Sequence, residues 1–430
     1  MKLSFVGRWS MALFASLALG LGMTACGGGT VGYMWVLGQE YNQVMGFKVD
    51  EYSGNLTEVP NAPFSSNGSV PVSLVLKSGG RYLYIINQGV CPTSGCGTAH
   101  NIGQSIALYS VGGDGTIVFQ QSYQSQGYYS MWAQMDSSGS YLYVVDKYSP
   151  GLNTNTNLYD AANSDGNGSI TVFSTDPNTG RLTLVTNSQT QKNGVNTPFW
   201  EVGPAPIMAK SLGGCLYTVN SGTTNGLETI TPFSIGSGGQ LGFTTTGNIP
   251  INEVAGNATK INSINGGGSY VFLTDGANSV LYGYQASGTC GLSALNGGTT
   301  VLNSGSFFPG TSNPTYTMLD STNKYLYIVN TSTSSTLVTT PYSSVSALAI
   351  NSSNQELTPV LGAPYPVGSG PTCIVEDPTN QYIYTSNYLA GTVTGYQINP
   401  GTGELTNLTK GSTFTATGQA SCLIISGAVS

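Results

Sequence analysis

Charged side chains are scarce in this sequence of 430 residues. Lysine and arginine number 12, aspartate and glutamate number 19, and together they make up 7% of the chain, against about a quarter in a typical soluble domain. Nucleic-acid binding needs lysine and arginine clustered on one surface, and a phosphate-rich ligand needs cations in one site. The composition therefore excludes a nucleic-acid partner and argues against a phosphorylated ligand.

Histidine and arginine are the rarest of the residues that usually carry chemistry. His100 is the single histidine, and the arginines are Arg8, Arg81 and Arg181. General acid–base catalysis and stabilisation of a developing anion draw on such side chains, and no His/Cys grouping with zinc-site spacing is present. We therefore expect no bound cofactor and a small catalytic inventory.

Long apolar runs are absent except at the N-terminus. Residues 9–22 form an apolar stretch that is too short to span a bilayer, and Lys2 and Arg8 precede it. A basic start, a short apolar core and small residues before a cut site are typical of a secretory signal. No other stretch of the chain has the length and apolar character of a transmembrane helix.

The cut site resembles a bacterial lipobox, because Ala25 directly precedes Cys26. The resemblance implies that Cys26 is acylated, so that the protein is exported and attached to the membrane by its N-terminal lipid. It divides the chain into a signal peptide (residues 1–25), a lipidated glycine-rich tether (26–31) and the domain (32–430). Gly27, in place of an aspartate, favours the outer membrane. A plain signal peptide cut near Ala25 is the alternative.

Seven copies of one pattern run through the rest of the chain. Each is a Tyr-Leu-Tyr-Ile-like strand, and the starts lie 49 to 74 residues apart. The copies begin at Tyr33, Tyr82, Tyr141, Cys215, Tyr270, Tyr325 and Tyr382. Five residues after the start, six copies carry a polar residue: Asn87, Asp146, Asn220, Asp275, Asn330 and Asn387. Fixed self-similarity of this kind indicates a repeat architecture.

Each copy is followed by further short runs with an alternating apolar pattern, such as residues 106–111 and 393–398. Gly, Asn, Asp and Pro bound these runs, which is typical of antiparallel strands. Four short strands per repeat and seven repeats predict an all-β, seven-bladed β-propeller of four-stranded antiparallel blades. The first copy lacks a preceding strand, and residues 420–425 form a strand without a repeat of their own. We therefore expect the C-terminal strand to complete the first blade and close the ring.

These motifs resemble the lactonase family of seven-bladed propellers, which includes 6-phosphogluconolactonase-like proteins. The Tyr-Leu-Tyr-Ile-x-Asn strand, the aromatic in the next strand and the Thr-Gly-x-Leu-Thr turn at residues 402–406 carry the resemblance, over residues 31–426. It implies a propeller whose enzymatic members open or close a lactone ring in the central channel. The motifs also resemble repeats of surface-layer propellers.

Long insertions predict the working face of the ring. Residues 88–104, 147–168 and 331–343 follow the tyrosine strand of three blades, and residues 187–203 precede an inner strand. In a propeller these connections open on one face, and long loops on a rigid scaffold commonly bind ligands. We expect ligand-binding residues there, or alternatively ordinary capped loops. The candidates are His100, Lys147, Tyr148, Trp200 and Glu201, with Glu201 as a weak candidate for a catalytic base.

Two polar groupings could be read as ligand sites. The Asn and Asp residues that end the tyrosine strands could form a ring of ligands, but the expected role is hydrogen bonding to their own turns. Asp160 and Asp165 are weak candidates for a Ca²⁺ site. Their spacing does not complete a calcium loop, so a solvated loop is the competing interpretation and no metal is predicted.

Six cysteines remain besides Cys26, and export to an oxidising compartment permits disulfides. Cys91 and Cys96 lie in one inserted loop, and Cys215 and Cys290 lie at corners on the same face of neighbouring blades. We predict both of these bridges. Cys373 and Cys422 occupy equivalent positions on adjacent inner strands, where either a bridge or two buried thiols is compatible with the pattern.

Three functions are compatible with these observations. The first is a monomeric surface module that binds glycan or protein through the loop face. The second is a lactonase-like hydrolase that acts on an uncharged extracellular lactone or sugar. The third is a structural, surface-layer-like protein. The anchor, the low charge and the few catalytic side chains favour the first.

Overall fold

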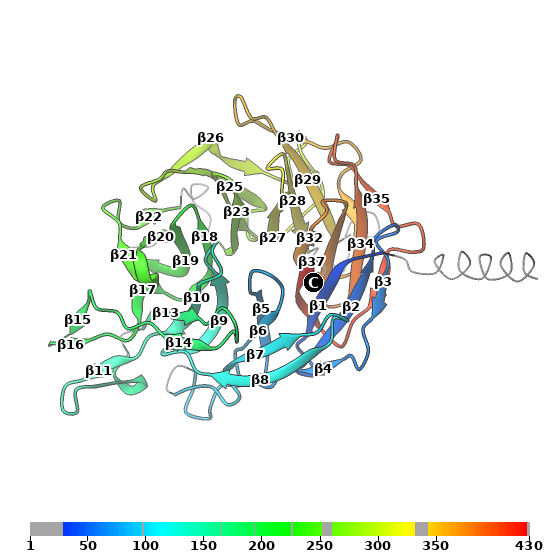
Figure 1. The fold of residues 1–430 in the computed structure, drawn as a ribbon. Helices are drawn as coiled ribbons and strands as arrows, with labels where there is room; N and C mark the ends of the chain where they lie inside the picture. The colour runs from blue at the N-terminus through cyan, green and yellow to red at the C-terminus, as the bar shows by residue number, and fades with distance from the viewer. Residues whose placement is uncertain are drawn as a thin grey trace, which may run out of the picture.

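The computed structural model describes residues 29–427 except 97–98, 165, 193, 225–226, 252–259 and 332–342. Within this part the chain forms a ring of seven antiparallel sheets (Figure 1), and we call the region that the seven inner strands enclose the central channel. The predicted all-β, seven-bladed propeller is confirmed. The only helical segments in the described residues are two 3₁₀ turns, η1 (Ala161–Asn163) and η2 (Ser237–Gly239).

The blades follow one another along the chain. Blade 1 contains β37 (Ala420–Gly427), β1 (Thr30–Gly38), β2 (Gln43–Asp50), β3 (Leu56–Glu58) and β4 (Phe64–Ser65). Blade 2 contains β5 (Pro71–Leu76), β6 (Tyr82–Asn87), β7 (Ser105–Val111) and β8 (Ile117–Tyr123). Blade 3 contains β9 (Tyr128–Met135), β10 (Tyr141–Tyr148), β13 (Asn167–Thr175), β14 (Leu182–Leu184) and β17 (Trp200–Pro204). Blade 4 contains β18 (Pro206–Leu212), β19 (Cys215–Thr224), β20 (Leu227–Ile235), β21 (Leu241–Phe243) and β22 (Ile249–Pro250).

The remaining three blades repeat this order from the channel outward. Blade 5 contains β23 (Ile261–Gly267), β24 (Tyr270–Asp275), β25 (Val280–Ala286) and β26 (Leu292–Val301). Blade 6 contains β27 (Pro314–Leu319), β28 (Tyr325–Asn330), β29 (Ser344–Ile350), β30 (Leu357–Pro359) and β31 (Tyr365–Pro366). Blade 7 contains β32 (Pro371–Glu376), β33 (Tyr382–Asn387), β34 (Thr392–Ile398), β35 (Leu405–Asn407) and β36 (Thr413–Thr415). Two hairpins form separate two-stranded sheets outside the blades: β11 (Gly151–Asn153) with β12 (Leu158–Asp160), and β15 (Gln191–Lys192) with β16 (Val195–Asn196).

The tyrosine strands lie where the repeats predict them. Six of the seven copies begin a strand at the first residue of the motif, and Tyr33 lies inside β1. Alternate residues of each strand face the two neighbouring blades, and both faces are buried, so Leu142, Tyr143 and Val144 are all inaccessible to solvent. The core consists of seven apolar layers between blades, which explains why these strands are apolar almost throughout.

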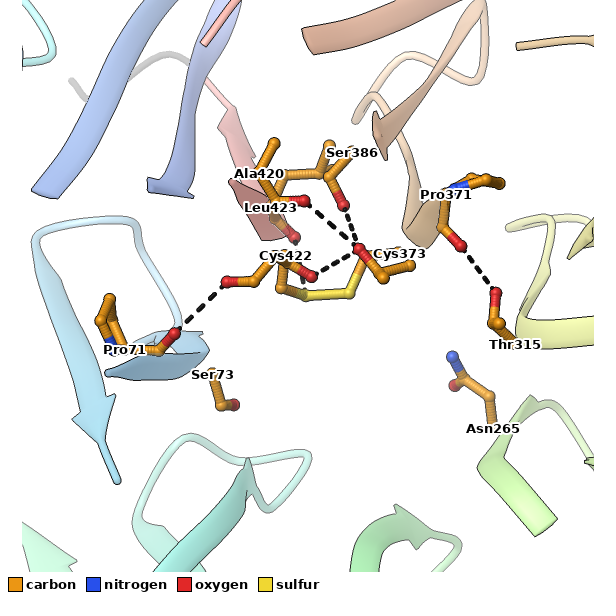
Figure 2. Close-up of a disulfide and its surroundings, with 12 residues drawn as sticks. Pro71, Ser73, Asn265, Thr315, Pro371, Cys373, Ser386, Ala420, Cys422 and Leu423 are labelled. Atoms are coloured by element: carbon orange, nitrogen blue, oxygen red, sulfur yellow. Dashed lines mark hydrogen bonds between the residues drawn. A yellow bond between two sulfur atoms is a disulfide. The ribbon is translucent and has the colours of Figure 1, made fainter. Parts of the chain in front are cut away.

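The ring closes through the C-terminal strand, as predicted. β37 pairs with β1, for example Trp35 with Ile424, and its other edge lies beside β32 and β5. A disulfide joins Cys373 of β32 to Cys422 of β37, with a Cα–Cα distance of 5.1 Å (Figure 2). The bridge that the sequence left open is therefore formed, and it fastens the last blade to the first.

Side chains near the start of the inner strands add hydrogen bonds between blades. Thr315 Oγ1 donates to Pro371 O (2.8 Å), Thr372 Oγ1 to Ser421 O (2.7 Å) and Ser421 Oγ to Pro71 O (3.3 Å). Figure 2 shows these bonds around the disulfide. They link blades 6, 7, 1 and 2 in succession, across the point at which the ring closes.

Candidate functional site

The ring has two faces with different connections. The first strand of each blade turns tightly into the second on one side, which we call the turn face. The second strand leads into the third on the opposite side, the loop face. The long insertions lie there. The hairpins β11–β12 and β15–β16 both belong to insertions of blade 3. These two insertions are in contact, because the ring centroids of Tyr159 and Phe199 lie 5.4 Å apart. The predicted insertion at residues 331–343 lies almost entirely outside the described residues.

Three of the five predicted ligand-binding residues come together on the loop face. The ring of His100 lies 4.7 Å from that of Tyr128, and Tyr128 pairs across the sheet with Tyr148. Lys147 Nζ lies 5.5 Å from the ring centroids of both Tyr129 and Tyr148. We call these five residues the Tyr129 cluster: an aromatic surface with one ammonium over two ring faces, an arrangement worth about 0.5–1 kcal/mol at an exposed site.

Tyr129 has a left-handed backbone that recurs at this place in the repeat, since Val70, Ala205 and Asn313 also have positive φ. Its φ is +64°, a left-handed conformation that costs about 1 kcal/mol or more for a bulky residue. It lies between the pairs Tyr148–Tyr128 and Asp146–Ser130, where the register is regular, and the bulge of β9 follows at Met131. The ring of Tyr129 lies 6.3 Å from that of Tyr148 in an edge-to-face arrangement. In this conformation the ring of Tyr129 lies beneath the Lys147 ammonium.

A buried polar network holds the backbone at Tyr129. The Gln104 side-chain oxygen accepts hydrogen bonds from the Tyr129 N–H (3.0 Å) and the Asn101 N–H (3.3 Å). One amide oxygen therefore holds the loop that carries His100 against the strand that carries Tyr129. The Gln104 side-chain nitrogen donates to Ser125 Oγ and Ser130 Oγ, both at 3.2 Å.

Asp146 lies at the base of the same network. Its carboxylate is inaccessible to solvent and accepts hydrogen bonds from Ser125 Oγ (2.8 Å), Ser130 Oγ (2.6 Å) and Thr171 Oγ1 (3.3 Å). Burial raises the pKa of Asp146 to about 6, and the three hydroxyls oppose that rise. Sequence analysis missed Tyr128, Tyr129, Gln104 and this network. The available signal was that Tyr128 and Tyr129 begin an inner strand between two insertions.

His100 is neutral at neutral pH. Partial burial in its loop lowers the pKa of the imidazole below its usual value, because desolvation disfavours the charged form. In the cluster it is therefore an aromatic, hydrogen-bonding side chain rather than a second cation.

The prediction for Trp200 is wrong. Its indole is 1% exposed, lies in the apolar layer between blades 3 and 4, and donates from Nε1 to Leu241 O at 2.8 Å. It cannot stack on a ligand. Glu201 lies opposite Ser169 because β17 pairs with β13, so its strand lies on the outer side of blade 3 rather than beside an inner strand. The insertion folds back as a fifth strand, and this removes both residues from the Tyr129 cluster.

Asp160 closes its own loop. Its side chain accepts from the Asn163 N–H (3.1 Å) and from Asn163 Nδ2 (2.6 Å), and Asn153 Nδ2 donates to it at 3.2 Å. These bonds lower the pKa of Asp160. Asp165, the other weak metal candidate, lies outside the described residues, as does Cys26. Among the residues that are described, no three His, Cys, Asp or Glu side chains gather as a metal site.

The polar residues at the strand ends differ from the expectation in their partners. Asn87, Asn220 and Asn387 donate to Ser or Thr hydroxyls of the neighbouring third strand, at 2.9 to 3.3 Å. Asp275 alone follows the prediction clearly, accepting from the backbone N–H groups of Ala277 and Asn278. These side chains are buried and structural, so they do not form a ring of ligands.

The two predicted disulfides are present. Cys91 is bonded to Cys96, and Cys215 is bonded to Cys290. No helix in the described part of the chain is both long and apolar enough to cross a membrane.

The fold places the protein in the class of seven-bladed propellers, and comparisons with known proteins define it further. The family model described as Lactonase, 7-bladed beta-propeller, matches residues 279–421, so the resemblance to this family is confirmed. No curated protein matches the sequence.

Solved structures share the fold over almost the whole chain. The periplasmic gluconolactonase PpgL of Pseudomonas aeruginosa is similar with a TM-score of 0.65 and 15% identity, covering 92% of this chain and 99% of that one. A candidate 6-phosphogluconolactonase from Bacteroides fragilis gives a TM-score of 0.64 at 15% identity, with 92% and 97% covered. A protein from Lactobacillus plantarum gives 0.65 at 14% identity, with 92% and 99% covered. At this identity the similarity establishes the fold.

Proposed function

We propose that the protein is an exported binding module that recognises a neutral carbohydrate ring at the Tyr129 cluster. The observation that carries the proposal is the meeting of Tyr129, Tyr148 and Lys147 on the loop face, with the backbone of Tyr129 held by Gln104. Aromatic faces stack on the C–H surfaces of a sugar, while Lys147 and the tyrosine hydroxyls offer donors to its hydroxyl groups.

Charge supports an uncharged ligand. The cluster contains one cation, Lys147, whose ammonium already lies over two aromatic rings. A phosphorylated sugar would need several cations, and this cluster has none to add. A neutral sugar, or the neutral lactone of a sugar acid, fits the surface better.

The predicted lipid anchor would orient this surface. The Gly29 carbonyl accepts from the Glu51 N–H at 2.9 Å, in the turn between β2 and β3 on the turn face, and β1 runs from there to the loop face. A lipidated Cys26, three residues before Gly29, would hold the turn face toward the membrane and leave the Tyr129 cluster facing outward. The three disulfides support export to an oxidising compartment. Radiolabelled palmitate should label the wild type and not Cys26→Ser; labelling of neither would contradict the anchor.

The binding experiment separates recognition from folding. Tyr129→Gly removes the ring and also the cost of the positive φ, so the variant should melt at the same or a higher temperature than the wild type. We expect it to lose at least tenfold in affinity for neutral oligosaccharides that the wild type binds, measured by calorimetry after a glycan-array screen. Tyr52→Ala, an exposed tyrosine of the turn between β2 and β3, is the matched control. Binding that survives in Tyr129→Gly would overturn the assignment.

A lactone hydrolase is the second candidate, and the match to the lactonase family model is the observation that favours it. The neutral imidazole of His100 is the side chain in the cluster best suited to act as a general base toward water. The test is acid release from a panel of uncharged sugar and acyl lactones, with His100→Ala and Glu201→Ala alongside. Turnover lost only in His100→Ala would support hydrolysis at the cluster, and loss only in Glu201→Ala would move the chemistry to the outer edge of blade 3. Absence of turnover on every lactone would leave the binding module.

A further inference from the structure

At one height along the axis of the ring, the inner strands of some blades carry polar side chains and those of the other blades carry apolar ones. On each inner strand, the residue opposite the third position of the tyrosine motif lies at an equivalent height. In blades 3, 4 and 5 these residues are Gln134, Lys210 and Asn265. In the four other blades they are Val75, Met318, Val375 and Ile424. Polar side chains thus occupy three adjacent blades and apolar ones the remaining four.

Lys210 faces the channel. Its neighbours Met208 and Ala209 point into the apolar layers on the two sides of blade 4, and Lys210 is directed like Met208, toward blade 5. The side chain keeps some accessible surface although protein surrounds it, and this burial lowers the pKa of the ammonium to about 8. Because protein encloses it, the accessible surface faces the channel rather than bulk water.

The amides beside Lys210 already have partners. Asn265 Nδ2 donates to Thr317 O of the next inner strand at 2.7 Å, and its side-chain oxygen accepts from the Gly266 N–H at 2.9 Å. Gln134 Nε2 donates to Met135 O at 2.9 Å. The Lys210 ammonium has no polar partner among the described residues, and no carboxylate offsets its burial. A buried charge without a partner is costly, so this position favours an incoming anion.

Two aromatic residues lie across the channel, two positions nearer the loop face. Trp132 of blade 3 and Tyr316 of blade 6 have ring centroids 6.2 Å apart, and each packs against the apolar layers of several blades. Trp132 Nε1 is a buried donor with no partner in the described structure. Burial raises the pKa of Tyr316 to about 12, so its hydroxyl stays protonated. The channel therefore contains two donors without partners in the described structure: the cationic ammonium of Lys210 and the indole N–H of Trp132.

One pocket on the turn face lies beside this level. A pocket of about 520 Å³ on the turn face is lined by residues 76–80 and 424–427. It includes Ile424, which belongs to the apolar side of the Lys210 level. This pocket therefore borders the apolar side of the Lys210 level.

We propose that the central channel binds a small monocarboxylate, with its carboxylate on the Lys210 ammonium and its short apolar body against Val375 and Ile424. The site is separate from the Tyr129 cluster and independent of the function proposed there. The single ammonium of Lys210 can neutralise a single carboxylate. The apolar side chains of Val375 and Ile424 disfavour hydrated inorganic anions.

Butyrate is the probe, and the first test uses the unmodified protein. Trace acetic anhydride at pH 8 acetylates lysines in proportion to their free amine, and mass spectrometry resolves each site. Saturating butyrate should slow acetylation of Lys210 at least fivefold and leave Lys147, on the loop face, unchanged. Equal labelling of Lys210 with and without butyrate would overturn the proposal.

Thermal shifts provide the second test. Butyrate should raise the melting temperature of the wild type in a concentration-dependent way. Lys210→Met should lose that rise while remaining at least as stable as the wild type at pH 7, because methionine removes the buried charge and keeps an unbranched side chain that is one atom shorter. Butylamine, with the same apolar body and the opposite charge, is the control. Protection by chloride equal to that by butyrate would show an unselective anion site and contradict the carboxylate assignment.

Discussion

The hydroxyl of Tyr384, in the last blade, donates a 2.6 Å hydrogen bond to the carbonyl of Gly54, in the first. The same bond joins Tyr84 to Gly180 (2.6 Å) and Tyr327 to Gly403 (3.0 Å). In each case the second tyrosine of the motif reaches the turn between the third and fourth strands of the next blade. The Tyr-Leu-Tyr motif therefore fastens neighbouring blades as well as forming strands.

The first tyrosine of the motif packs against the same glycine, Tyr382 against Gly54 and Tyr325 against Gly403, and blade 4 has a covalent version of this packing contact. Its motif begins with Cys215 in place of tyrosine, and Cys290 occupies the corresponding turn of blade 5 with a φ of +63°. The glycines of the equivalent turns also have positive φ, for example Gly54 (+66°) and Gly403 (+74°). The disulfide between Cys215 and Cys290 thus replaces a tyrosine–glycine contact at the same place in the repeat.

The first prediction concerns Tyr384→Phe. Removing the hydroxyl leaves the buried Gly54 carbonyl without this donor, so we expect the free energy of unfolding to fall by about 1–2 kcal/mol. Tyr217→Phe is the matched control, because the Tyr217 hydroxyl is buried with no partner in the described structure, and its loss should be neutral or stabilising. Urea unfolding of both variants makes the comparison, and equal destabilisation would contradict the role of the hydrogen bond.

The second prediction concerns Gly403→Ala. A Cβ at this position would lie 2.3 Å from a ring carbon of Tyr325, and φ is +74°, so backbone strain and a steric clash add. We expect a loss of about 3 kcal/mol. Gly213→Ala has a φ of +57° but nothing within 4 Å of its Cβ, and should lose only about 1 kcal/mol. Similar melting temperatures for the two variants would show that the contact with Tyr325 is unimportant.

The third prediction concerns ring closure. The Cys373–Cys422 bridge spans 49 residues, and constraint of the unfolded chain by a loop of that length is worth about 4 kcal/mol. The bridge between Cys91 and Cys96 spans five residues and should contribute about 2 kcal/mol in the same treatment. Paired cysteine-to-alanine variants, unfolded in denaturant without reductant, test the order; a larger loss from the short loop would refute it.

The fourth prediction concerns pH and Glu376. One carboxylate oxygen accepts from the Ser321 N–H at 2.7 Å, and the other is buried without a partner in the described structure. Burial, aided by Asp320 and Asp377, raises the pKa of Glu376 from 4.5 to about 7. The folded state therefore binds this proton more tightly than the unfolded state, and stability rises as the pH falls from about 7 toward 4.5.

Glu376→Gln removes the buried charge and isolates this effect. We expect the variant to be more stable than the wild type at pH 8.5 by about 1 kcal/mol, since the partial exposure of the carboxylate reduces the full effect. At pH 5 the two proteins should melt at similar temperatures. A constant difference in melting temperature across this range would rule out titration of Glu376 as its cause.

Much of the fold could be predicted from residue order because its determinants are local. Alternating apolar residues from Tyr82 to Asn87, and the turn residues around them, specify a strand of known length wherever the blade lies. Repetition of that pattern seven times determines the number of blades, and the unpaired strand at residues 420–425 determines how the ring closes. The disulfide of Cys91 with Cys96 follows from their proximity along the chain.

The functional surfaces depend on contacts that no local pattern encodes. Trp200 is of a residue type that often binds ligands, but β17 folds back onto β13 and buries its side chain. Tyr129 and Lys210 lie in ordinary inner strands, and only the contact with Gln104 and the curvature of the ring place them at the loop face and the channel. The sequence by itself determined the blades, their order and their closure, because hydrogen bonding and burial along a strand repeat with its residues. Tertiary structure alone decided which side chains meet, because that depends on distances between blades that are far apart in the chain.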